Sequence, residues 1–190
     1  MLLLAYTTDN MLKLREAAIE DSLIVGIAEG DKDSFTSLYK LSGRTVYAYA
    51  LSILKNTAEA EDVLQDTFLK IRSSAHLYVP QGKPMAWILT ITKNVCLMRL
   101  RRQQNISFFP LENLDESAML KEITDLEDRI VLKSALHILS PEECQIIILH
   151  SVTGCKHSEI AALLEMPVST VLSKYHRGLK KLKAELEGKL

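Results

Sequence analysis

The segment from Ser140 to Leu186 most restricts the possible folds, because it predicts three helices joined by two breaks. The first helix begins at Ser140, where a hydroxyl N-cap is followed by proline and two carboxylates, and it ends before Thr153-Gly154. A short helix follows and stops at Met166-Pro167, since the residue before proline avoids the helical region. From Ser169 onward, apolar residues recur at a helical period of about 3.6 residues. The segment therefore predicts a helix-turn-helix.

The third of these helices is basic on the face predicted to lie opposite its apolar residues. Residues 174–183 hold five lysines and arginines and no acid. Such a helix suits binding in the major groove of DNA, with its first turns at base edges and its cations on phosphates. A solvated basic helix is the alternative interpretation. The side chains expected to face DNA are Thr170, Ser173, Lys174, Arg177 and Lys181.

The first hundred residues show helical periodicity interrupted by polar breaks. Strand alternation is absent from the sequence, so the expected fold class is all-α. Thr57 is the predicted N-cap of a helix whose apolar face is Ala60, Val63, Leu64, Thr67, Phe68 and Ile71. Its other face carries Asp62, Gln65, Asp66 and the apolar Leu69. An exposed leucine among acids and amides is typical of the centre of a protein interface, although it can also be accidental.

A further helix is predicted from Pro84, after the loop of residues 79–83. It is apolar around most of its girth and should be buried, with Trp87, Ile91, Val95 and Met98 along one side. We assign Trp87 to the core. The helix ends in Arg99, Arg101 and Arg102, which could complement the helix dipole or bind nucleic-acid phosphates. Beyond Gln103 the apolar period lapses, and residues 112–128 hold seven acids and one lysine, which predicts a linker.

Length and composition limit the remaining possibilities. The 190 residues suffice for one or two small domains. Three scattered cysteines argue against a disulfide scaffold and favour a reducing cytoplasm. No stretch approaches the roughly 18 apolar residues of a membrane span, and the first residues lack the pattern of a signal peptide.

Two parts of the chain together resemble one known family. The segments AEDVLQDTFLKI and PMAWILTITKNVCLMRLRR precede LSPEECQIIILH, EIAALLEMP and STVLSKYHRGLKKL, in the order found in the extracytoplasmic-function sigma factors of bacteria. The resemblance covers roughly residues 31–102 and 137–186. Each motif alone is modest, but two different domains that match in order are specific.

The resemblance implies a dissociable initiation subunit of RNA polymerase with no enzymatic activity and no cofactor. It implies a tail (1–20), sigma region 2 (21–104), a linker (105–128) and sigma region 4 (129–190). Core RNA polymerase would be bound by Asp62, Gln65, Asp66 and Leu69. The minus ten element of promoter DNA would be bound by Asn94, Arg99, Arg101 and Arg102. The helix-turn-helix would read the minus thirty-five element. Such factors are commonly inhibited by an anti-sigma protein.

Three positions depart from the family pattern. Met98 replaces a usual aspartate, Lys156 replaces a hydroxyl N-cap, and Leu172 replaces a lysine. A lysine has no acceptor for capping, which forgoes about 1 kcal/mol unless Ser158 or another neighbour substitutes. Leu172 removes one expected phosphate contact. Promoter choice therefore stays open.

Two other functional classes compete with the initiation factor. One is a DNA-binding regulator that has this fold but does not dock on polymerase. The other is a metal or thiol enzyme built on Cys144, His150, Cys155 and His157. Their spacing does not match a usual zinc site, and we expect no metal site.

Overall fold

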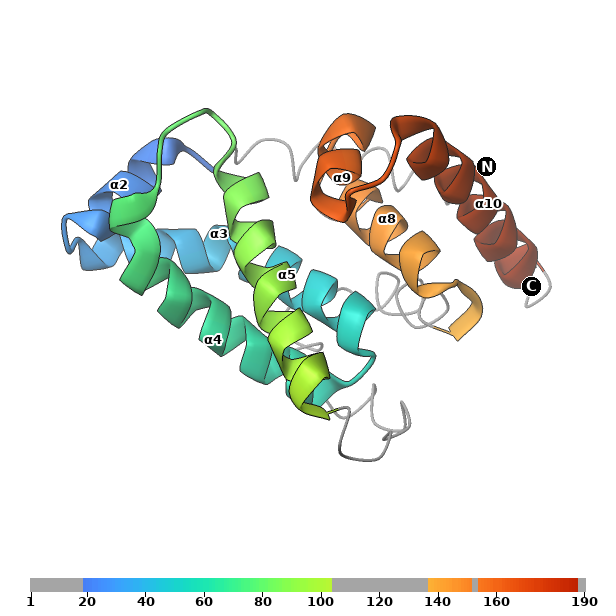
Figure 1. Ribbon diagram of the computed structural model, residues 1–190, viewed down its shortest axis with the longest axis horizontal. Coiled ribbons are helices and arrows are strands. Elements are labelled where there is room, and N and C mark those ends of the chain that lie inside the picture. The colour runs from blue at the N-terminus through green and yellow to red at the C-terminus, as the bar shows by residue number, and fades with distance from the viewer. Residues whose placement is uncertain (1–18, 104–136, 152–153, 188–190) are drawn as a thin grey trace.

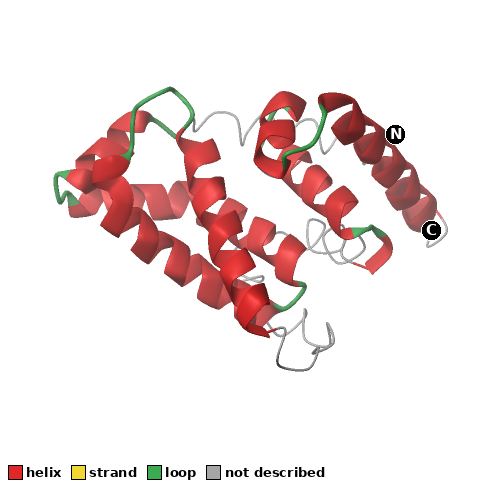
Figure 2. Ribbon diagram, in the orientation of Figure 1, coloured by secondary structure: helices red, strands yellow, loops and turns green. Residues whose placement is uncertain are grey.

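The computed structural model describes residues 19–103, 137–151 and 154–187, and within these ranges the secondary structure is helical (Figures 1 and 2). The elements are α2 (Asp21–Ala28), α3 (Lys32–Leu54), α4 (Thr57–Ser74), the 3-10 helix η1 (Ala75–Leu77), α5 (Pro84–Gln103), α8 (Pro141–Ser151), α9 (His157–Leu164) and α10 (Val168–Glu187). The all-α prediction is confirmed. No helix of the described ranges has the length and apolar character that crossing a membrane requires. The predicted tail and linker lie largely outside the described residues.

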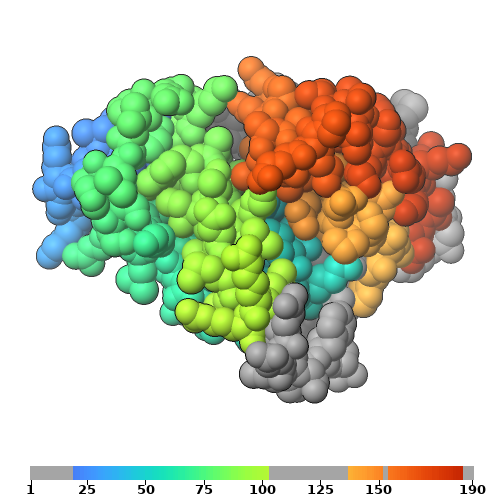
Figure 3. Space-filling model, viewed as in Figure 1, coloured from blue at the N-terminus to red at the C-terminus, as the bar shows by residue number. Residues whose placement is uncertain are grey.

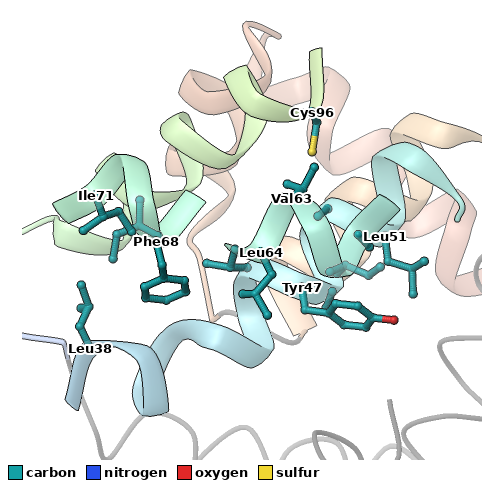
Figure 4. Packing of buried hydrophobic residues seen from close by; sticks show 14 of the residues in the cluster. Leu38, Tyr47, Leu51, Val63, Leu64, Phe68, Ile71 and Cys96 are labelled. Atoms are coloured by element: carbon teal, nitrogen blue, oxygen red, sulfur yellow. The ribbon is translucent and has the colours of Figure 1, made fainter. Parts of the chain in front are cut away.

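Helices α2 to α5 share one apolar core, in which α4 packs against α3 and α5 (Figure 4). The six residues predicted for the apolar face of α4 are all buried, which confirms its helical period. The predicted N-cap is wrong by one residue. Asn56 is the cap, because its side-chain oxygen accepts from the Glu59 N–H at 3.0 Å and places Thr57 in the first turn.

Helix α5 is the central element expected from its composition, with one exception. Ile88, Leu89 and Cys96 are buried completely. Trp87 is half-buried against this core, with its ring 5.0 Å from that of Tyr78. The prediction that Met98 lies on the apolar face is wrong, because its side chain is 53% exposed. A pattern that is apolar around the whole helix does not reveal which side faces water.

A glutamate in the first turn accepts a hydrogen bond from the cap residue at the N-terminal ends of both α8 and α9. At α8, the Ser140 hydroxyl accepts from the Glu143 N–H and the Glu143 carboxylate accepts from the Ser140 N–H, which is a capping box. At α9, the Lys156 ammonium can only donate, and the Glu159 carboxylate accepts from the Lys156 N–H at 2.8 Å. Glu159 therefore supplies one half of a capping box, and its own N–H, which a hydroxyl cap would bind, donates to the Lys156 carbonyl at 2.9 Å.

Helix α10 approaches α8 closely at Gly178. A Cβ atom added there would lie 2.6 Å from Ile147 Cδ1, while its next neighbours would be at ordinary contact distances. Gly178 is buried between Tyr175 and Leu182 on the face that meets α8. Glycine ordinarily lowers the stability of a helix, but here the absence of a side chain allows the close packing of α10 on α8.

Replacing Gly178 with alanine is expected to destabilise the protein by up to about 2 kcal/mol, because overpacking against Ile147 costs about 1–3 kcal/mol and alanine returns roughly 1 kcal/mol of helix stability. Ile147→Val removes the clashing Cδ1 atom, so in that background Gly178→Ala should be neutral or stabilising. A double-mutant cycle by urea unfolding measures the coupling. Equal costs of Gly178→Ala in both backgrounds would contradict this account.

The two groups of helices, α2–α5 and α8–α10, pack against each other (Figures 1 and 3). Tyr49 of α3 and Leu89 of α5 share a buried cluster with residues of α8, α9 and α10. Lys93 Nζ of α5 donates to the Leu163 carbonyl and to Glu165 Oε1, both at 2.8 Å, at the end of α9. We call this the packed arrangement.

Candidate polymerase and DNA interfaces

The face of α4 predicted to bind polymerase is exposed, and its negative charge is partly neutralised by an arginine of α5. Leu69 is 64% exposed, and Gln65 is exposed beside it. Asp62 and Asp66 both pair with Arg99 of α5, at 2.9 Å and 2.8 Å. The remaining apolar surface at Leu69 therefore lies beside a carboxylate pair whose positions are fixed by one guanidinium.

Arg99 connects α5 to α4 through three carboxylates, since Glu59 Oε2 lies 3.0 Å from its Nη1. Burial alone would lower the pKa of Arg99, but the hydrogen bonds to Asp66, Glu59 and Asp62 outweigh it and raise the pKa. The sequence grouped Arg99 with Arg101 and Arg102. The structure instead brings it together with the predicted polymerase-binding acids, a contact between residues far apart in the chain.

The other residues predicted for the minus ten element lie on the exposed side of α5. Asn94, Arg101 and Arg102 are exposed, and Met98 lies between them on the same side. These side chains could meet a nucleic-acid strand that runs along the helix. Met98 presents an exposed apolar side chain where the family pattern has an acid.

On α10, the structure separates the five predicted DNA-facing residues into two sets. Ser173 and Arg177 are exposed, the latter at 60%, and Thr170 is half-buried. Lys174 pairs with Glu142, and Lys181 Nζ lies 2.7 Å from Glu143 Oε2. Arg177 Nε also lies 3.9 Å from Glu143 Oε1, so three of the five residues have carboxylates of α8 within reach. Long lysine side chains can reach acids on a neighbouring helix in this way. That the five side chains face DNA stays a prediction.

Glu143 joins the cap of α8 to the basic helix, a role that sequence reasoning missed. Its side chain is almost fully buried and accepts from Lys181 and from Ser140. Burial would raise the pKa of Glu143, but these hydrogen bonds outweigh it and lower the pKa. The spacing of Ser140 and Glu143 was the available signal, since a capping box fixes the position of its glutamate.

The residues considered for metal or thiol chemistry do not form a reactive site. Burial raises the pKa of Cys144 to about 12, so this thiol stays protonated at neutral pH. His150 stacks on His157 at 4.3 Å, and both contact the Tyr175 ring edge-on. Among the described residues, no group of three potential ligands is placed to hold a metal ion. The cluster packs α8, α9 and α10 together.

A basic helix-turn-helix on an all-helical architecture is typical of DNA-binding proteins. Two parts of the chain also match families of known proteins. Residues 38–106 match the Sigma-70 region 2 family, and residues 129–182 match the Sigma-70 region 4 family. RNA polymerase sigma factor CarQ of Myxococcus xanthus is 29% identical over 85% of this chain and 94% of its own length. ECF RNA polymerase sigma factor SigK of Mycobacterium sp. (strain KMS) is 26% identical over 86% and 88%, respectively.

The fold also matches a solved structure, the sigma factor RpoE of Bartonella quintana in complex with the anti-sigma factor NepR. The TM-score is 0.63 at 22% identity, over 83% of this chain and 98% of that chain. The two family matches occur in order and together span more than half of the residues. The chain belongs to the extracytoplasmic-function sigma factors. It is a transcription initiation factor and not an enzyme.

Proposed function

We propose that this sigma factor docks on core RNA polymerase through the α4 face around Leu69 and recognises promoter DNA through α5 and α10. Arg99 would hold Asp62 and Asp66 in place on the docking face. Asn94, Arg101 and Arg102, with the loop before α5, would bind the non-template strand of the minus ten element. Arg177 and Ser173, flanked by Thr170, Lys174 and Lys181, would read the minus thirty-five element.

The exposed face of α10 carries this proposal. The helix is anchored to α8 through Val171, Gly178 and Leu182, which leaves Ser173 and Arg177 toward solvent. A helix held in this way can enter the major groove with base-reading side chains at its N-terminal half. The Lys174 ammonium can exchange Glu142 for a phosphate, since a pair with an exposed carboxylate contributes little stability. Lys181 would keep its pair with Glu143, because its departure would leave a buried carboxylate unpaired.

An anti-sigma protein is a further expected partner, and the cytoplasm is the expected location. The RpoE structure that shares this fold contains an anti-sigma factor. A protein of this kind could cover the α4 face, which presents an exposed leucine beside paired acids. The polymerase and the promoter DNA that the proposal requires are both cytoplasmic.

The experiment that tests the function is binding of the purified, fluorescently labelled protein to bacterial core RNA polymerase, followed by selection of promoters from a random duplex pool. We expect saturable binding, and promoter fragments that the polymerase retains only with the protein. Arg177→Ala should weaken retention of those fragments by about tenfold and leave polymerase affinity unchanged. A folded protein that binds DNA but not polymerase would instead be a regulator with a sigma fold.

A further inference from the structure

The loop between η1 and α5 is fixed at both of its ends by one carboxylate. The Tyr78 hydroxyl donates to Asp21 Oδ1 at 2.5 Å, and the Gly82 N–H donates to Asp21 Oδ2 at 2.7 Å. Asp21 is the first residue of α2, so a residue some sixty positions earlier in the chain closes this loop. Gly82 adopts a left-handed φ of 68°, which turns its N–H toward the carboxylate at little steric cost.

A second contact strengthens the N-terminal end of the loop. The Tyr78 ring lies 5.0 Å from the Trp87 ring of α5, so Tyr78 is held by its hydroxyl on α2 and by its ring on α5. Burial and the hydrogen bond to Asp21 raise the pKa of Tyr78 to about 12, which keeps the phenol a donor at neutral pH. Asp21, Tyr78 and Trp87 thus connect three elements of the N-terminal helices.

The tip of the loop is exposed although its ends are fixed. Val79 is 65% exposed, and Pro80 and Gln81 are also exposed. The tip offers an apolar surface beside an amide that can both donate and accept hydrogen bonds. An unpaired base presents a flat apolar face and a polar edge, which a rigid tip of this kind complements.

We propose that Asp21 is the positioning residue that holds the 78–83 loop in the conformation that receives the unpaired strand of the minus ten element. This inference rests on the proposed function, in which this loop and α5 bind that strand. A loop that is already ordered does not lose conformational entropy when the strand binds, so its closure favours the melted promoter. Asp21 acts through the loop and does not itself contact DNA.

A purely structural role is the competing interpretation, since an aspartate in the first turn also stabilises its own helix. Asp31 offers a matched control. It caps α3 by accepting from the Asp33 and Ser34 N–H groups at 3.0 Å, and the loop is not among its contacts given by the structure. Asp31→Ala therefore removes a carboxylate and three hydrogen bonds at a helix start, the third from the Ser34 hydroxyl, without releasing the loop.

The test uses holoenzyme assembled from core polymerase and each variant, on a promoter selected by the wild-type holoenzyme and labelled with 2-aminopurine in the minus ten element. Asp21→Ala is expected to lower the yield of melted promoter by about tenfold, with unchanged polymerase affinity and unchanged binding to the minus thirty-five duplex. Tyr78→Phe should produce a smaller loss, and adding it to Asp21→Ala should have little further effect.

Equal losses for Asp21→Ala and Asp31→Ala would overturn the proposal, because fold stability alone would then explain both. Normal melting by Asp21→Ala would overturn it as well. Failure of the wild-type protein to bind core polymerase is a different result, which would contradict the proposed function itself.

Discussion

Replacing Leu69 with aspartate is expected to weaken binding to core RNA polymerase by about thirty-fold or more. A leucine at the centre of an interface excludes water from its neighbours, and truncating such a residue costs about 2 kcal/mol. An aspartate adds an unpaired charge beside Asp66, which must then be buried on binding. Leu69 is 64% exposed in the free protein, so the substitution should change the free energy of unfolding by less than about 0.5 kcal/mol.

Leu77→Asp is the matched control for this prediction. Leu77 is 69% exposed and lies in η1, beyond the end of α4. The Leu77→Asp substitution introduces the same charge at a leucine of similar exposure, outside the proposed docking face. Fluorescence anisotropy should give wild-type affinity for Leu77→Asp and a large loss for Leu69→Asp. If both variants lost affinity equally, the binding would depend on net charge and not on the α4 face.

Local patterns predicted the individual helices well. The α4 face was correct at every position because burial on one side of a helix imposes a period that is visible in the sequence. The capping residue of α4 was missed by one position, since Asn56 and Thr57 are both good caps and only the backbone decides between them. Met98 was misplaced because α5 is apolar on several sides and its period carries no direction.

Contacts between helices were beyond the reach of the sequence. The pairing of Arg99 with Asp62 and Asp66 joins two helices that the sequence treated as separate sites. The role of Gly178 depends on Ile147 in the facing helix. Lys174 and Lys181 were placed by period alone, which cannot show that Glu142 and Glu143 lie within their reach. Each of these depends on the distance between elements, which no local pattern contains.

The packed arrangement also bears on promoter binding. Elements centred about 10 and 35 base pairs upstream of the start site lie roughly 85 Å apart on B-form DNA, at about 3.4 Å per base pair. Lys93 of α5 and Glu165 after α9 are in contact at 2.8 Å. If α5 and α10 bind these two elements as proposed, α8–α10 must move away from α2–α5 when the promoter is bound.

Replacing Tyr49 with phenylalanine is expected to stabilise the packed arrangement by about 1–3 kcal/mol. The Tyr49 side chain is completely buried where the two groups of helices meet, and its hydroxyl has no hydrogen-bond partner among the described residues. A buried, unpaired hydroxyl opposes packing, and it regains hydrogen bonds to water when the helices separate. Phenylalanine keeps the ring and removes that penalty.

The variant should therefore unfold at a higher urea concentration and form promoter complexes more slowly. Each 1.4 kcal/mol in favour of the packed arrangement lowers the population of the separated form about tenfold, and only that form can span both elements. Tyr39→Phe is the control, since Tyr39 lies on the same helix but is 40% exposed and packs its ring on Phe68 of α4 at 4.8 Å. Higher stability with unchanged kinetics of promoter binding would show that separation is not a slow step, and unchanged stability would show that the Tyr49 hydroxyl is satisfied in solution.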